Sequence, residues 1–117
     1  MLRMKCPGGF GKMNTGHITN EIRTAIRSII SIEKHLDAVF GFGSFFRGEP
    51  FRDIDVLAVT SSGNTELLRT YYLIIATLSP IAAQLGRPIH LIMFTPDEFN
   101  SWPLRDMRQL QTLWTSD

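Results

Sequence analysis

The segment from Asp53 to Thr60 most constrains the fold of this 117-residue chain. Its side chains alternate: Ile54, Val56 and Ala58 face one way, and Asp53, Asp55 and Leu57 face the other. This alternation predicts a β-strand with one buried face, and it places the two carboxylates together on the other face, roughly 6–7 Å apart. Like charges this close repel each other. A divalent cation would relieve the repulsion, because hard ions prefer carboxylate oxygens.

Apolar periodicity on either side of this strand predicts further elements. A helix is expected from Thr19 or Asn20 to about Leu36, because aliphatic residues recur there at steps of three or four. Those residues are Ile18, Ile22, Ile26, Ile29, Ile32 and Leu36. Apolar runs predict a short strand over residues 38–42 and a third strand over residues 89–94.

Two later segments predict helices. A helix is expected from Thr65 to Leu85, and Pro80 should kink it or end it early. Thr95-Pro96-Asp97-Glu98 is typical of a helix start, with a threonine cap, a proline at the first position and acids in the first turn. A final amphipathic segment runs from about Leu104 to Trp114.

The order helix, strand, strand, helix, strand, helix indicates an α+β fold. We expect a small mixed β-sheet with helices packed on one face, because the first two strands can pair as neighbours and the third returns after a helix. A hydrophobic share of 44% and a charged share of 20% are typical of one globular domain. We assign residues 17–117 to this domain and residues 1–16 to a flexible N-terminal arm.

Composition argues against several functional classes. The formal charge of +1, from 12 basic and 11 acidic residues, gives no strong signal for nucleic-acid binding, which usually needs a concentrated basic face. No stretch approaches the ~20 apolar residues of a membrane helix, so no membrane association is expected. Cys6 is the only cysteine, which predicts no disulfide framework and favours a cytoplasmic location.

The residues before the acidic strand are suited to binding phosphate. At Gly43-Ser44, glycine lets the backbone approach a phosphate, and the serine hydroxyl and nearby amides can donate to its oxygens. Arg47 and Arg52 supply positive charge for the remaining oxygens. Together with the two carboxylates, the parts needed for metal-assisted phosphoryl or nucleotidyl transfer fall within thirteen residues. The pattern alone does not choose which group is transferred.

This stretch resembles the signature of the DNA polymerase beta nucleotidyltransferase superfamily, in which Gly-Ser at a strand end precedes Asp-x-Asp in a hydrophobic strand. Arg47-Gly48 is especially similar to the minimal nucleotidyltransferases of bacteria and archaea, and the resemblance covers about residues 20–100. It implies that Asp53 and Asp55 hold two Mg²⁺ ions, or alternatively Mn²⁺, and that ATP or another NTP donates a nucleoside monophosphate and releases pyrophosphate. The residues that would contact the nucleotide are Gly43, Ser44, Arg47 and Arg52.

His90 departs from that signature. Active members usually place a third carboxylate on a later strand, and the polar residue at that position here is a histidine. Three interpretations stay open: His90 is a ligand or a general base, the site binds nucleotide and metal with little or no turnover, or His90 is an inert residue at a strand edge. Asp97 and Glu98 belong to a helix-start motif, so we interpret them as capping residues and not as replacement ligands.

The resemblance implies transfer of a nucleotide to a hydroxyl group of a protein or a small molecule. Similar small domains include antitoxin partners of helical toxin proteins, so a helical toxin-type partner is one expectation. Trp102, Leu113 and Trp114 near the end of the chain would form an exposed apolar patch for a partner, and this patch fits either a homodimer or a helical partner protein. Because of His90, the alternative hypothesis is a catalytically degenerate domain that serves as a nucleotide-binding or protein-interaction module.

Overall fold

The computed structural model describes residues 15–61, 65–101 and 110–116. Within them the elements are α1 (Thr15–Ile30), β1 (Leu36–Phe42), β2 (Ile54–Thr60), α2 (Leu67–Leu85), β3 (Ile89–Phe94), α3 (Pro96–Ser101) and β4 (Gln111–Thr115). None of the helices in these residues is long and apolar enough to cross a membrane. The three predicted strands are present, each within one or two residues of its expected limits.

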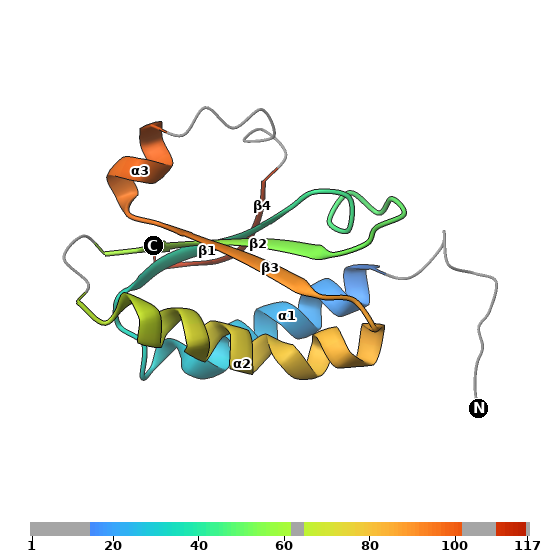
Figure 1. Ribbon diagram of the computed structural model, residues 1–117, viewed down its shortest axis with the longest axis horizontal. Coiled ribbons are helices and arrows are strands. Elements are labelled where there is room, and N and C mark those ends of the chain that lie inside the picture. The colour runs from blue at the N-terminus through green and yellow to red at the C-terminus, as the bar shows by residue number, and fades with distance from the viewer. Residues whose placement is uncertain (1–14, 62–64, 102–109, 117) are drawn as a thin grey trace.

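Four strands form one mixed sheet in the order β3-β2-β1-β4 (Figure 1). β1 pairs antiparallel with both β2 and β4, whereas β2 and β3 run parallel. The parallel pair follows from α2, which carries the chain back so that β3 starts at the same end of the sheet as β2. The predicted mixed sheet is confirmed.

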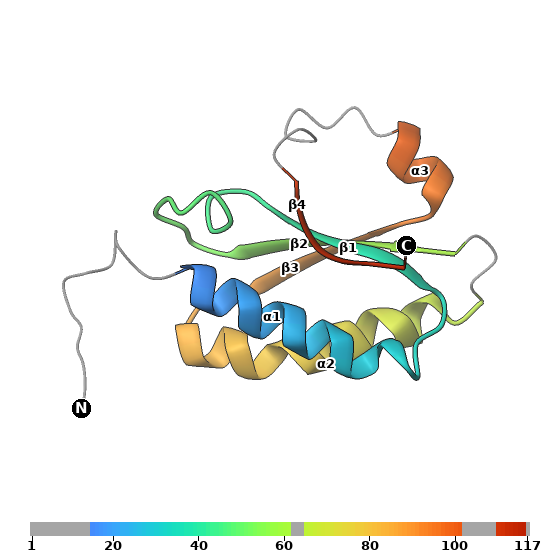
Figure 2. The ribbon, with the colours of Figure 1, turned by 180° about the vertical axis from the view of Figure 1, so that it is seen from behind.

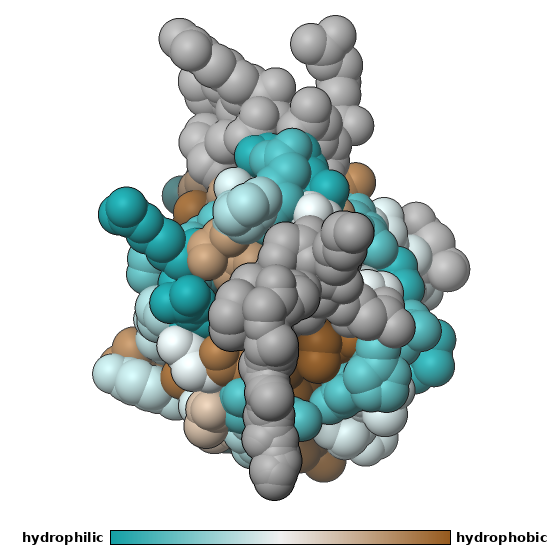
Figure 3. Space-filling view, turned by 90° about the vertical axis from the view of Figure 1, so that its right-hand side faces the viewer, coloured by the Kyte–Doolittle hydropathy of each residue, from teal (hydrophilic) through white to brown (hydrophobic). Residues whose placement is uncertain are grey.

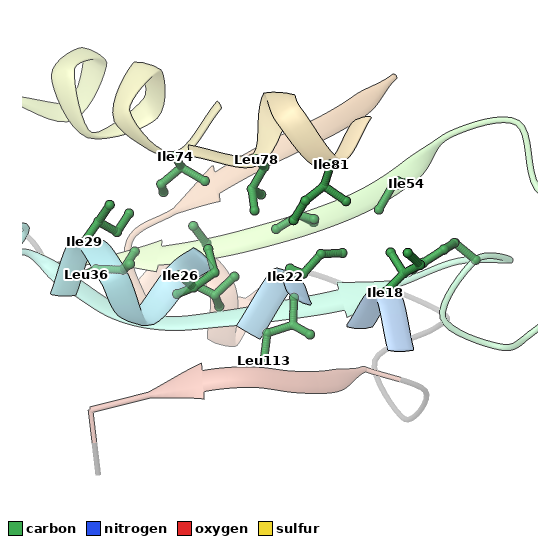
Figure 4. Packing of buried hydrophobic residues seen from close by; sticks show 14 residues of the cluster. Ile18, Ile22, Ile26, Ile29, Leu36, Ile54, Ile74, Leu78, Ile81 and Leu113 are labelled. Carbon is green, nitrogen blue, oxygen red and sulfur yellow. The ribbon is translucent and has the colours of Figure 1, made fainter. Parts of the chain in front are cut away.

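α1 and α2 lie side by side on one face of the sheet and pack the core against it (Figures 1 and 4). The fully buried members of this core include Ile22, Ile26, Val39, Ile54, Val56, Ala58, Ile74 and Leu78. The predicted apolar face of β2 is therefore the face that these helices cover. Alternation along the strand directs Asp55 to the opposite, outer face of the sheet.

The short helix α3 lies on the other side of the sheet from α1 and α2 (Figures 1 and 2). The ring of Phe99 stacks on Phe40 of β1, with centroids 5.3 Å apart. Its predicted start is confirmed as a reciprocal cap: the Thr95 amide donates to the Glu98 carboxylate at 2.9 Å, and the Glu98 amide donates to the Thr95 hydroxyl at 3.2 Å. Because α3 follows the end of β3, the starts of β2 and β3 lie away from it.

The predicted limits of α1 are wrong at both ends. The helix begins at Thr15, so two residues assigned to the arm are helical, and residues 1–14 lie outside the described residues. It ends at Ile30, well before Leu36, which is the first residue of β1. Spacing could not reveal this end, because Ile32, which is 61% exposed, and Leu36 continue the same three-to-four step.

The buried carboxylate of Glu33 stabilises the turn that replaces the end of the predicted helix. Glu33 Oε1 accepts a hydrogen bond from the His35 amide at 3.2 Å, and Oε2 accepts one from the Thr70 hydroxyl at 3.0 Å. These bonds join the chain after α1 to the first turn of α2. The local side-chain bond to the backbone competes with continuation of the helix.

The expectation that Pro80 ends α2 early is wrong. The helix runs through Pro80 to Leu85 and stops at Gly86, whose φ is 69°. Proline removes the partner of the Ala76 carbonyl four residues earlier. Both Ala76 and Pro80 are exposed, so water can satisfy that carbonyl.

Strand β4 replaces the later part of the predicted amphipathic segment. It pairs with β1, with Trp114 opposite Val39, and residues 102–109 lie outside the described residues. Leu113 is buried in the core and Trp114 is partly buried against it. These two residues therefore do not form the exposed apolar patch expected of them, and Trp102 lies outside the described residues.

Candidate active site

Asp53 and Asp55 lie at the start of β2, an inner strand of the sheet. Asp55 is the second residue of the strand and is in register with His90 of β3. Asp53 directly precedes the strand, where the Ile54 amide donates to the Pro88 carbonyl at 2.9 Å and fixes the chain. The two side chains are 33% and 24% exposed, respectively. The carboxylates therefore share a partly open site on the outer face.

Gly43 lies directly against this carboxylate pair. It follows Phe42, which is opposite Asp55 in the β1–β2 pairing, and its φ of 82° lies in the left-handed region that favours glycine. A Cβ atom at this position would lie 2.5 Å from Asp55 Oδ2. Glycine therefore lets the backbone of the Gly43-Ser44 corner approach the carboxylate.

Ser44 and Arg47 lie in a compact turn after this glycine. The Arg47 amide donates to the carbonyls of Gly43 and Ser44 at 3.3 and 3.1 Å. The Arg47 guanidinium contacts the Ser44 hydroxyl at 3.5 Å and pairs with Glu49 at 3.1 Å. Sequence reasoning missed Glu49, although its charge two residues after Arg47 was a usable signal. A phosphate at this corner would compete with Glu49 for the guanidinium.

Aromatic side chains hold the same loop on the core. Phe45 is fully buried, and the rings of Phe46 and Phe51 each meet it edge-on at a centroid separation of 4.8 Å. Phe46 also lies over Gly41, where a Cβ atom would meet the ring at 2.5 Å. This packing fixes the position of the Gly43-Ser44 corner relative to the strand.

Arg52 ends the loop directly before Asp53, and its side chain is exposed. No ion pair within residues 15–61, 65–101 and 110–116 joins the Arg52 side chain to the site carboxylates. The predicted contact of Arg52 with phosphate stays a prediction. Figure 3 views the molecule from the side on which this loop lies, where hydrophilic side chains cover much of the surface. Residues 47–50 of the loop are exposed, so this part of the loop is accessible to a charged ligand.

His90 completes a group of three potential ligands. Its Nδ1 atom lies 3.4 Å from Asp53 Oδ2 and 3.7 Å from Asp55 Oδ1. One donor atom from each residue lies within 4.8 Å of the other two. Asp97 and Glu98 are not members of this group in the described part of the chain, and the hydrogen bonds of Glu98 belong to the cap of α3.

The surroundings of Asp55 disfavour its charged form. Burial is the main cause that raises the pKa of Asp55 above its ordinary value of 3.8, and the neighbouring Asp53 charge raises it further. Electrostatic interaction with His90 lowers the pKa of Asp55, whereas a side-chain hydrogen bond with Asp53 raises it. A cation held by the carboxylates would offset the repulsion. Two carboxylates and an imidazole thus form a donor set that fits a divalent metal ion.

The raised pKa predicts how the metal-free protein responds to pH. The folded state holds the Asp55 proton more tightly than the unfolded state, so ionisation of Asp55 lowers the free energy of unfolding at neutral pH. We expect Asp55→Asn to be more stable than the wild type at pH 7. The difference should shrink as the pH falls through the folded-state pKa towards 3.8. Denaturant titrations at several pH values measure it, and a variant less stable than the wild type at pH 7 would contradict the assignment.

Comparisons with known proteins identify the fold. No family profile and no curated protein sequence matches the chain. A candidate nucleotidyltransferase from Sulfolobus solfataricus is similar in structure, with a TM-score of 0.63 and 17% identity over 94% of this chain and 91% of that one. A mutant MntA–HpeT toxin–antitoxin structure is similar with a TM-score of 0.53 and 18% identity, over 85% of this chain and 74% of that one. The chain therefore has the nucleotidyltransferase fold that the resemblance implied.

Proposed function

We propose that this chain transfers a nucleoside monophosphate from ATP or another NTP to a hydroxyl group of a protein or a small molecule, in a metal-dependent reaction. The observation that carries the proposal is the close approach of the Gly43-Ser44 corner to the Asp55 carboxylate. A Cβ atom at Gly43 would lie only 2.5 Å from Asp55 Oδ2. Backbone suited to phosphate and carboxylates suited to a metal ion therefore serve one small site.

The proposed reaction is an attack by the acceptor hydroxyl oxygen on the α-phosphorus. The bond from that phosphorus to the bridging oxygen breaks, so pyrophosphate leaves with the electron pair, and the hydroxyl proton passes to water at this open site. Asp53 and Asp55 would hold Mg²⁺ or Mn²⁺, which supplies charge neutralisation for the phosphates and the leaving group. Gly43, Ser44 and Arg47 would orient the triphosphate through their amides, hydroxyl and guanidinium.

The openness of the site supports a protein as the acceptor. The side chain of His90 is 58% exposed and that of Asp53 is 33% exposed, so a bulky molecule can approach the carboxylates. The toxin–antitoxin neighbour also supports a protein partner. We propose a helical toxin-type protein, with a second copy of this chain as the alternative, and a reaction in the cytoplasm.

A second candidate function is a nucleotide-binding or protein-interaction module without turnover. The observation that favours it is the imidazole of His90 at the position of the third carboxylate, where it faces Asp53 and Asp55. This module would keep the fold and the phosphate-binding corner. Binding of nucleotide without transfer distinguishes it from the enzyme.

Labelled ATP tests the proposed reaction. We expect the chain with Mg²⁺ or Mn²⁺ to transfer label from the α-phosphate of ATP to a protein acceptor, supplied as the chain itself or as a soluble protein extract. ATP labelled at the γ-phosphate should leave the same acceptors unlabelled, because that phosphate departs with pyrophosphate. Label from the γ-position would contradict nucleotidyl transfer. No label from either position, with nucleotide binding intact, would favour the module.

A further inference from the structure

The third side chain of the site differs in chemistry from the two carboxylates. His90 is in register with Asp55 across the parallel β2–β3 pair. Its side chain is 58% exposed, yet Nδ1 faces the carboxylates at 3.4 Å from Asp53 and 3.7 Å from Asp55. A nitrogen donor thus lies beside two oxygen donors where β2 and β3 begin.

The spacing of these donors suits one shared metal ion. Metal–ligand bonds of about 2.0–2.2 Å place adjacent ligand atoms roughly 3.0–3.6 Å apart in octahedral or tetrahedral coordination. The two distances from His90 Nδ1 are 3.4 and 3.7 Å, and all three donors lie within 4.8 Å of one another. Small side-chain rotations would therefore bring all three atoms to bonding positions.

An imidazole ligand changes which ion such a site prefers. Mg²⁺ prefers oxygen ligands and retains its waters, whereas Co²⁺ and Zn²⁺ accept mixed nitrogen and oxygen ligands and bind more tightly. We infer that His90 is the third metal ligand and that it shifts the preference of this site from Mg²⁺ towards a transition-metal ion such as Co²⁺ or Zn²⁺. The inference rests on the proposed function for the place of the metal, and it concerns which divalent ion this site binds more tightly.

Metal titration of the nucleotide-free chain tests the inference. Calorimetry with Co²⁺ and with Mg²⁺ gives the ratio of the two affinities, and visible absorption reports the ligands of bound Co²⁺. We expect His90→Asp to lower the Co²⁺-to-Mg²⁺ affinity ratio by roughly tenfold or more and to alter the Co²⁺ spectrum. His17→Gln is the matched control, because it removes the histidine of another histidine–carboxylate pair, His17–Glu21 at 2.9 Å. We expect it to change neither the affinity ratio nor the Co²⁺ spectrum.

Two results would overturn the inference. One is that His90→Asp leaves both the affinity ratio and the Co²⁺ spectrum unchanged. The other is that His17→Gln changes them as much as His90→Asp does. If circular dichroism shows that His90→Asp is unfolded, His90→Gln decides by the same criteria. The outcome is separate from that of nucleotidyl transfer, because neither nucleotide nor acceptor is present. Metal binding that depends on His90 in a chain that transfers no label would keep this inference and reject the proposed reaction.

Discussion

Asp55→Asn is expected to slow nucleotidyl transfer by about a thousandfold. In the proposed reaction this carboxylate holds the metal ion that stabilises the charge on the transferred phosphate, and losing about 4 kcal/mol of such stabilisation corresponds to this factor. Asparagine keeps the shape of the side chain, so the change removes charge with little change in packing. Initial rates of transfer from α-labelled ATP, measured over a range of metal concentrations, give the effect.

A matched substitution separates the role of this carboxylate from a general loss of negative charge. Asp97→Asn changes an exposed carboxylate in the first turn of α3, outside the ligand group, and should retain the wild-type rate. Equal losses in both variants would contradict the role given to Asp55. Because Asp55→Asn should also stabilise the metal-free protein at neutral pH, its unfolding curve shows whether lost activity comes from lost chemistry or from lost structure.

Gly43→Ala is expected to have a second large effect, a loss of roughly a hundredfold in transfer, because it would displace a carboxylate that we propose as a metal ligand. The new Cβ atom would lie 2.5 Å from Asp55 Oδ2, so either the carboxylate or the Gly43-Ser44 corner must move. The φ of 82° adds strain of about 1–2 kcal/mol for any residue with a Cβ atom. Transfer rates and metal affinity should therefore fall together.

Gly86→Ala is the control for backbone strain. Gly86 also has a positive φ, 69°, but among the described residues a Cβ atom there would meet no side chain or backbone atom of a non-neighbouring residue within 4 Å. Both variants should lose similar stability, and Gly43→Ala alone should lose metal affinity. The account of this corner fails if Gly43→Ala binds metal as the wild type does, or if Gly86→Ala weakens metal binding to the same extent.

The elements that depend on local patterns could be predicted from the sequence. Alternation along residues 54–60 and the helical spacing of Ile18, Ile22, Ile26 and Ile29 identified a strand and a helix that the structure contains. The end of α1 could not be predicted in this way, because Leu36 continues the helical spacing but pairs with Thr60 in the sheet. Strand β4 was not predicted, because it forms by pairing with β1, which is distant in the sequence.

The part of the site that lies on strands could be predicted from the sequence, whereas the side-chain contacts within the loop could not. The strand period indicated that Asp53 and Asp55 share a face, and the family resemblance implied that His90 takes the place of a third acid beside them; the structure brings all three together. The opposite charges of Arg47 and Glu49 made an ion pair possible, but whether the two side chains meet depends on the turn that the loop adopts.

The proposed function requires a metal ion and a triphosphate to bind together between the carboxylates and the Gly43-Ser44 corner. The most direct measurement is the thermal unfolding midpoint with a non-hydrolysable ATP analogue, with a divalent ion, and with both. We expect the two ligands together to raise the midpoint by roughly 10 °C at concentrations far above their dissociation constants, and much more than either ligand alone. A midpoint that the pair leaves unchanged, or a shift from the analogue that is the same with and without metal, would contradict the claim.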